Sequence, residues 1–215
     1  MSVPVPLPVP SLSKWVPDSF TPPSAEVLGY ALTHTMLYIT DPEASLRFYR
    51  NYMGMSLVFA QNTGPFTIFY LAYPSLGDVA PADIARSMAS RSGLLELVHV
   101  HSTDDMTAGD MSDRCGGFGH IGFVVPDVTR ALQRARDAGY HVSGSVEDTS
   151  KGKMPGLPTS LTNETFSPGF ARAFSQLGFV RDPDGYDIFS IAVNELSHRS
   201  KDGINSSTLF CEMQT

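Results

Sequence analysis

The chain has 215 residues and a formal net charge of −7 at pH 7, with 42% hydrophobic and 17% charged residues. This composition is typical of a globular protein, and its acidic balance argues against a nucleic acid or an anionic membrane surface as partner. No apolar run reaches the roughly 18–20 residues that span a bilayer. The two cysteines lie far apart, and residues 1–10 lack the pattern of a secretory signal. A reduced, cytoplasmic setting is therefore predicted.

Residues 1–23 are predicted to form a Pro-rich N-terminal arm, because their closely spaced prolines forbid a regular helix. Ser24 then has the character of a helix N-cap, which predicts a short helix over residues 25–32.

From residue 34 onward the sequence contains an internal repeat with a spacing of 86 residues. In each copy a histidine opens an apolar strand, an aspartate follows seven residues later, and a glycine follows after nineteen or twenty. The aspartate is predicted to cap the N-terminus of a helix, and the glycine to supply the left-handed residue beyond its end. The repeated residues are His34, Asp41, Leu46 and Gly54 in the first copy and His120, Asp127, Leu132 and Gly139 in the second.

Helical spacing of apolar residues predicts the buried stripe of each helix. Three strand-like segments follow each helix, so each copy is predicted to have the order β-α-β-β-β, and the fold class is α+β. The stripes are Leu46, Tyr49 and Met53, then Leu132, Ala135 and Ala138; the strands are 55–61, 66–73 and 93–101, then 140–142, 174–181 and 186–193. An Asp-Pro-Asp-Gly sequence at 182–185 predicts a tight turn before the last strand.

This repeat resembles the vicinal oxygen chelate (VOC) fold of glyoxalases, bleomycin resistance proteins and dihydroxybiphenyl dioxygenases, and glyoxalase I in particular. The resemblance covers residues 24–193, with one module at about 33–101, a second at about 118–193, an insertion at 157–176 and a tail at 194–215. It is carried by His34-Thr-Met-Leu, Ser45-Leu-Arg-Phe-Tyr49, Gly54-Met, Leu95-Glu-Leu97, Gly117-Phe-Gly-His-Ile-Gly122, Val125-Pro-Asp-Val128, Gly152-Lys-Met154 and Asp182-Pro-Asp-Gly-Tyr186.

The resemblance implies a divalent metal held by His34, Glu96 and His120. Imidazole and carboxylate groups are suitable ligands for zinc, nickel, cobalt, manganese or iron. Glu96 lies inside an apolar strand, where an unpartnered carboxylate would be costly. His99, His101 and His141 are interpreted as structural, the first two because they alternate to the other strand face.

The fourth family ligand, a glutamate that also transfers the proton, is replaced by Phe189. The repeat gives the same alignment, since Phe189 falls opposite Glu96. Asp187 lies on the same strand face, about 6.6–7 Å along it. It is a weak candidate for the base, and a solvated residue at the strand end is the favoured interpretation.

The positions that fix glutathione in the family have changed as well. Tyr38, Val100 and Gly116 stand where the family has an arginine, an asparagine and an arginine, and only Lys153 persists. The pocket should therefore be drier and suit a less charged ligand than glutathione. The insertion is either a lid over the site or a surface excursion.

The leading hypothesis is a metal-dependent lyase or isomerase that acts on a small enolisable carbonyl or vicinal-oxygen substrate in a specialised, biosynthetic role. The alternatives are a lactoylglutathione lyase with a substituted base, a ferrous oxygenase with two histidines and one carboxylate, and a ligand-binding protein without catalysis. The resemblance also implies a homodimer.

Overall fold

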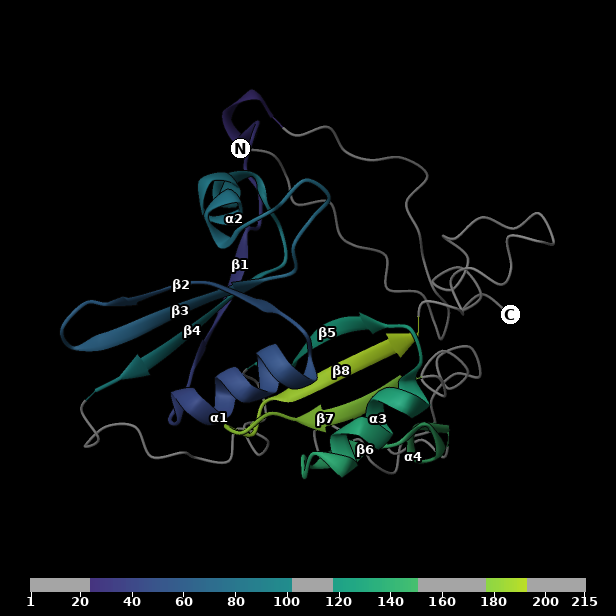
Figure 1. Ribbon diagram of the computed structural model, residues 1–215. Coiled ribbons are helices and arrows are strands. Elements are labelled where there is room, and N and C mark those ends of the chain that lie inside the picture. Colours follow the sequence, from purple (N-terminus) through teal and green to yellow (C-terminus); the bar gives the residue numbers. More distant parts are fainter. Residues whose placement is uncertain (1–23, 102–117, 151–176, 193–215) are drawn as a thin grey trace, which may run out of the picture.

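The computed structural model describes residues 24–101, 118–150 and 177–192. The expectations for the N-terminal arm, Lys153, the insertion and the tail lie outside these ranges. The described chain folds into two four-stranded sheets, ordered β1-β4-β3-β2 and β5-β8-β7-β6 (Figure 1). Each half of the chain supplies one sheet together with helices of its own, so the predicted α+β fold of two βαβββ modules is confirmed.

The two modules have the same strand order and differ in their additional helices. The first contains η1 (Ala25–Val27), β1 (His34–Tyr38), α1 (Pro42–Leu46), η2 (Arg47–Tyr52), β2 (Ser56–Asn62), β3 (Phe66–Ala72), α2 (Pro81–Ser87), η3 (Met88–Ser90) and β4 (Leu94–Val100). The second contains β5 (His120–Val125), α3 (Val128–Asp137), β6 (Val142–Gly144), α4 (Val146–Ser150), β7 (Leu177–Arg181) and β8 (Asp187–Ala192).

The predicted helix caps are confirmed in both modules. The Asp41 carboxylate accepts the backbone N–H groups of Glu43 and Ala44, and the Asp127 carboxylate accepts that of Arg130. Gly54 and Gly139 end their helices with φ of 82° and 80°. A side chain is strained in that left-handed region, which accounts for glycine at both positions.

The predicted buried stripes were only partly right. The first helix continues from α1 into the π-helical η2, which turns Phe48 and Tyr52 into the core beside Tyr49. Leu46 and Met53 are only partly buried, because the wider π turn shifts the face that the regular helical period predicts. In α3, Leu132 and Ala135 are buried as expected, and Ala138 is exposed.

Two local predictions need correction. The expected helix over 25–32 is a single 3₁₀ turn, η1, which buries no residue, and Ser24 makes no side-chain cap. Residues 24–32 are all exposed, so they bury little apolar surface that would stabilise a longer helix, and Gly29 has φ 88°. Conversely, α2 was not predicted, although Pro81 at its first position and Asp83 two residues later are helix-start signals.

One apolar core joins the modules. Phe48, Tyr49 and Tyr52 from η2 belong to the same cluster as Leu132 and Ala135 from α3. Strand β7 approaches helix α3 closely at Gly178, where an added Cβ would lie 2.8 Å from a methyl group of Val128. The two modules therefore fold as one packed unit.

Buried carboxylates of the β7–β8 turn also tie the modules together. Asp184 accepts hydrogen bonds from the backbone N–H and the hydroxyl of Thr40, both at 2.7 Å, and from the Ser45 hydroxyl at 2.9 Å. Asp182 accepts one from the Tyr49 hydroxyl at 2.7 Å. The Gly185 N–H donates to the Asp182 carbonyl at 3.1 Å, which confirms the predicted tight turn, and the carboxylates of this turn fix the corner between β1 and α1 of the other module.

Among the described residues, no helix has the length and apolar character needed to cross a membrane.

Candidate metal centre

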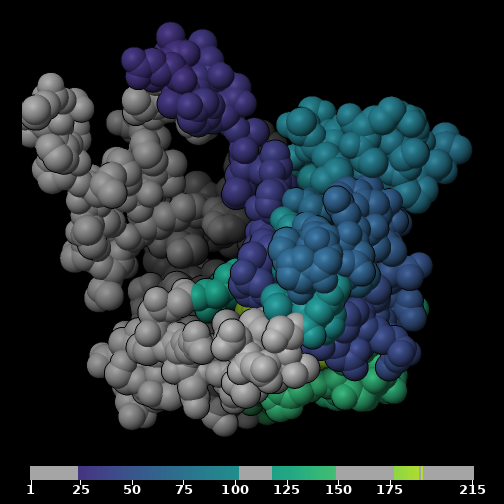
Figure 2. All heavy atoms as spheres, turned by 90° about the vertical axis from the view of Figure 1, so that its left-hand side faces the viewer, coloured from purple at the N-terminus to yellow at the C-terminus, as the bar shows by residue number. Residues whose placement is uncertain are grey.

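The structure brings His34 and Glu96 together on one face of the first sheet. β1 and β4 are parallel neighbours, and Glu96 pairs with Met36, two residues after His34. The Nε2 atom of His34 lies 3.1 Å from Oε2 of Glu96, and these side chains are 38% and 15% exposed. Figure 2 shows the purple segment that contains β1 at the molecular surface. The pair is accessible from solvent and is fixed by two paired strands.

Two hydroxyl groups orient this pair. Tyr70, on β3 beside β4, donates a hydrogen bond of 2.8 Å to Oε2 of Glu96, and burial together with this bond raises the pKa of Tyr70 to about 12. The phenol therefore stays protonated as a donor at neutral pH. The Thr33 hydroxyl lies 2.9 Å from Nδ1 of His34 and can donate or accept, so it suits either tautomer of the ring. Such outer partners typically orient metal ligands.

The second sheet repeats this backbone register. Glu96 pairs with the residue two after His34, and Phe189 pairs with Gly122, two after His120. The backbone of Phe189 thus occupies in β8 the position that Glu96 occupies in β4. An apolar residue stands where the first module has its carboxylate.

Asp187 is not the solvated residue that was favoured at this strand end. It is 5% exposed, it accepts a hydrogen bond of 3.0 Å from the Ser143 hydroxyl, and its Oδ1 lies 3.5 Å from Nε of Arg181. Burial is tolerated because the carboxylate has a cationic and a hydroxyl partner. The sequence did not reveal this burial, because Ser143 is 44 positions away and Arg181 faces Asp187 only through the register of the β7–β8 hairpin.

His120 does not join His34 and Glu96 within one chain. Across residues 24–101, 118–150 and 177–192, no group of three or more His, Cys, Asp or Glu side chains is arranged to hold a metal ion. His120 is exposed, and its ring lies edge-on to Phe179 with centroids 6.2 Å apart. The three predicted ligands are thus divided between two half-sites, one in each sheet.

Of the other predicted site residues, Gly116 and Lys153 lie outside the described ranges, and Tyr38 and Val100 lie in the strands that carry His34 and Glu96. Tyr38 is 46% exposed on the same strand as His34, and Val100 is partly buried on β4. His101 is engaged by the Thr67 hydroxyl at 2.8 Å and the Gly64 carbonyl at 2.7 Å, and Nδ1 of His99 lies 3.4 Å from the Ile39 carbonyl. These contacts agree with a structural role for both histidines.

Family models and known relatives agree with this architecture. A model of the Glyoxalase/Bleomycin resistance protein/Dioxygenase superfamily matches residues 31–188. The chain belongs to this superfamily. A lactoylglutathione lyase of Pseudomonas putida is 30% identical over 164 residues, which is 73% of this chain and 82% of the relative. One from Pseudomonas aeruginosa is 29% identical over 170 residues, 76% and 83% of the two chains.

The solved structure of a glyoxalase I from Leishmania major, described as trypanothione-dependent, superposes with a TM-score of 0.52 at 18% identity. The match covers 81% of this chain and 94% of that one. At this identity the likeness bears on the fold alone, which is that of the superfamily.

Proposed function

We propose that this protein is a metal-dependent lyase or isomerase of the glyoxalase type, acting on a small substrate with a carbonyl or two vicinal oxygens. The observation that carries the proposal is the His34–Glu96 pair, held at 3.1 Å on an accessible face by Tyr70 and Thr33. The relatives named lactoylglutathione lyase support the reaction class.

The donor set fits a divalent cation in type. His34 and Glu96 would hold it through an imidazole nitrogen and a carboxylate oxygen, and His120 would be the third donor. A bound cation would supply Lewis-acid polarisation of the substrate carbonyl. The proposal includes a homodimer in which His120 comes from a second copy, because the described part of one chain offers only the pair. The exposed Met36, Tyr38 and His120 leave both half-sites open to such a partner.

The protein's own side chains favour a substrate unlike the glutathione hemithioacetal of methylglyoxal. Tyr38 and Val100 present aromatic and aliphatic surface, and neither can form the bidentate ion pair that an arginine makes with the carboxylates of glutathione. Phe189 cannot accept a proton, and a positioned base typically contributes about 10²–10⁴-fold. We therefore propose a diverged, specialised reaction in which the chain orients and desolvates a less charged carbonyl compound.

The second candidate is lactoylglutathione lyase itself, with another group as base. The names of the relatives favour it, and Asp187 is a buried carboxylate two residues before Phe189. Its contacts with Ser143 and Arg181 assign it a structural task, so we keep it as the weaker candidate.

Cobalt binding tests the metal centre. Equilibrium dialysis should show saturable Co²⁺ binding to the wild type, weakened roughly tenfold or more in His34→Ala, Glu96→Gln and His120→Ala. His141→Ala is the matched control, because His141 is exposed and is not one of the proposed ligands. Wild-type affinity in Glu96→Gln would contradict the assignment.

Mixing the variants tests the shared site. If each site combines His34 and Glu96 of one chain with His120 of the other, a heterodimer of His34→Ala and His120→Ala contains one intact site. Mixing the two variants after brief dissociation should then restore part of the cobalt binding. A site within one chain predicts no recovery, and a monomer in sedimentation would rule out the dimer.

Turnover of the hemithioacetal distinguishes the two candidate reactions. The wild type should be nearly inactive, and Phe189→Glu should raise the rate by roughly 10²-fold or more if only the base is missing. Wild-type turnover comparable to that of the Pseudomonas putida enzyme would establish the second candidate. Phe189→Gln is the control, since it adds polarity without a base.

A further inference from the structure

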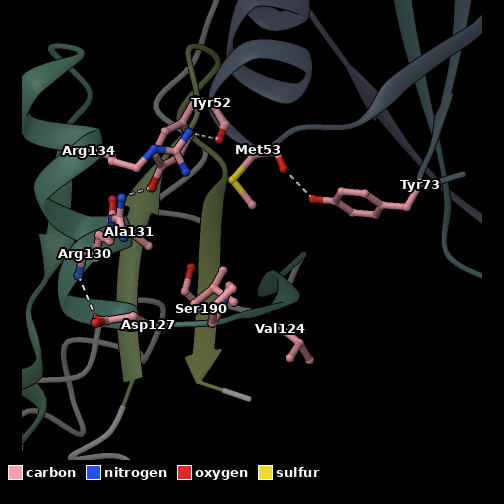
Figure 3. Close-up of a pocket in the computed structure, with 11 residues that line it drawn as sticks. Tyr52, Met53, Tyr73, Val124, Asp127, Arg130, Ala131, Arg134 and Ser190 are labelled. Atoms are coloured by element: carbon pink, nitrogen blue, oxygen red, sulfur yellow. Dashed lines mark hydrogen bonds between the residues drawn. The ribbon is translucent and has the colours of Figure 1, made fainter. Parts of the chain in front are cut away.

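A cavity lies at the junction of the two modules. It has a volume of about 560 Å³ and is lined from the first module by Tyr52, Met53 and Tyr73 (Figure 3). Val124, Arg130 and Arg134 line it from the second module. None of His34, Glu96 and His120 contributes to it. Its size falls within the range of about 300–1,000 Å³ that is typical of small-molecule sites.

One side of this cleft is cationic. Arg130 and Arg134 lie one turn apart on α3, opposite Tyr73 in Figure 3. Arg134 is anchored, since it donates a hydrogen bond of 2.8 Å to the Tyr52 carbonyl and lies 5.3 Å from the centroid of the Tyr52 ring. A guanidinium has five N–H donors, so this contact leaves most of them available.

Arg130 is the less constrained of the two. Among the described residues its guanidinium has no hydrogen bond or ion pair. The Asp127 carboxylate also lines the cleft, and its Oδ1 accepts the backbone N–H of Arg130 at the start of α3. The cleft therefore offers unused guanidinium donors in spite of the protein's negative net charge.

The other side is apolar and accessible. Tyr73 and Val124 are 47% and 59% exposed, although both belong to residue types that gain from burial. The Tyr73 hydroxyl donates a hydrogen bond of 2.6 Å to the Met53 carbonyl, which holds the ring in place along the wall. An aromatic ring, a thioether and a branched side chain together suit a flat, apolar body.

We propose that this cleft is a binding site for a small organic anion, a carboxylate or sulfonate on an aromatic or flat aliphatic body. The anionic group lies between Arg130 and Arg134, where charge-assisted hydrogen bonds hold it. The apolar body covers Tyr73, Met53 and Val124. The site does not depend on the metal or on the reaction proposed above, because the two share no residue.

Two fluorescent probes with the same ring system test the proposal. 8-Anilinonaphthalene-1-sulfonate carries the anionic group, and N-phenyl-1-naphthylamine lacks it. Titration of the native protein should show saturable binding of the sulfonate. Arg130→Gln should weaken this binding by roughly 5- to 10-fold and leave the neutral probe unchanged, since only the charge-assisted contact is lost.

Two further variants make the outcome specific. Arg136→Gln removes the same charge from an exposed position of α3 that does not line the cleft, and it should bind both probes as the wild type does. Val124→Glu places a negative charge on the apolar wall and should weaken the sulfonate more than the neutral probe. Equal sulfonate affinity in the wild type and Arg130→Gln, or an equal loss in Arg136→Gln, would overturn the assignment.

Discussion

At the scale of single residues, the candidate metal centre depends on side chains that hold the ligands. Tyr70 fixes Glu96, and its ring stacks on Phe59 with centroids 5.0 Å apart. The stacking holds the ring of Tyr70, and the hydrogen bond holds its hydroxyl group. A ligand oriented in this way loses less conformational freedom when it binds a cation.

Tyr70→Phe should keep the packing and remove only the hydroxyl. Because Glu96 then loses its donor, we expect the Co²⁺ dissociation constant to rise about tenfold or more with little change in folding. Tyr30→Phe removes a hydroxyl from a residue that is 81% exposed and serves as the control. Unchanged cobalt affinity in Tyr70→Phe would show that Glu96 needs no such support.

The sequence predicted the ligands better than their supports. A histidine that opens a strand and a glutamate in an apolar strand stand out, and the parallel pairing of β1 and β4 brings them together as expected. Tyr70 does not stand out, because a tyrosine in a strand of aromatic residues looks like ordinary core. Only the register that pairs Tyr70 with Glu96 reveals its role.

At the scale of elements, the second module depends on how closely α3 lies on β7. Gly178 allows this approach, since a Cβ there would lie 2.9 Å from both methyl carbons of Leu132. The repeat predicted α3 and its cap, but a strand glycine carries no signal of what packs above it. The π turn in η2 was missed for a similar reason, because tertiary contacts decide it, whereas Pro81 and Asp83 did signal the start of α2.

Gly178→Ala should therefore destabilise the protein by about 1–3 kcal/mol through overpacking. Urea unfolding followed by circular dichroism measures the change. Gly119→Ala is a matched control, because a Cβ at Gly119 would meet nothing within 4 Å. A variant at 178 that is as stable as the one at 119 would mean that α3 shifts freely.

At the scale of the whole molecule, a buried acidic turn joins the modules. Burial, together with the charge of Asp184, raises the pKa of Asp182 from 3.8 to about 6, against the hydrogen bonds from Tyr49 and from the backbone N–H groups of Asp184 and Tyr186. The folded protein thus holds this proton more tightly than the unfolded chain does. The resulting stabilisation is fully present below about pH 4 and is lost as the pH rises through 6.

Asp182→Asn removes this titration while keeping an acceptor for the backbone N–H groups. Between pH 4 and pH 7, the unfolding free energy of the wild type should fall relative to that of the variant by roughly 2–3 kcal/mol. Urea unfolding at several pH values measures it. A difference that stays constant with pH would contradict a raised pKa at this carboxyl.

The same turn has a consequence for synthesis on the ribosome. Thr40 and Asp184 are 144 positions apart, so the hydrogen-bond acceptor for the β1–α1 corner is among the last parts of the domain to be made. At about 5–20 residues per second, the nascent first module waits roughly 7–30 s for it. During that interval Thr40, Ser45 and Tyr49 lack their native hydrogen-bond acceptors. The first module can therefore complete its native contacts only after the second module has been translated.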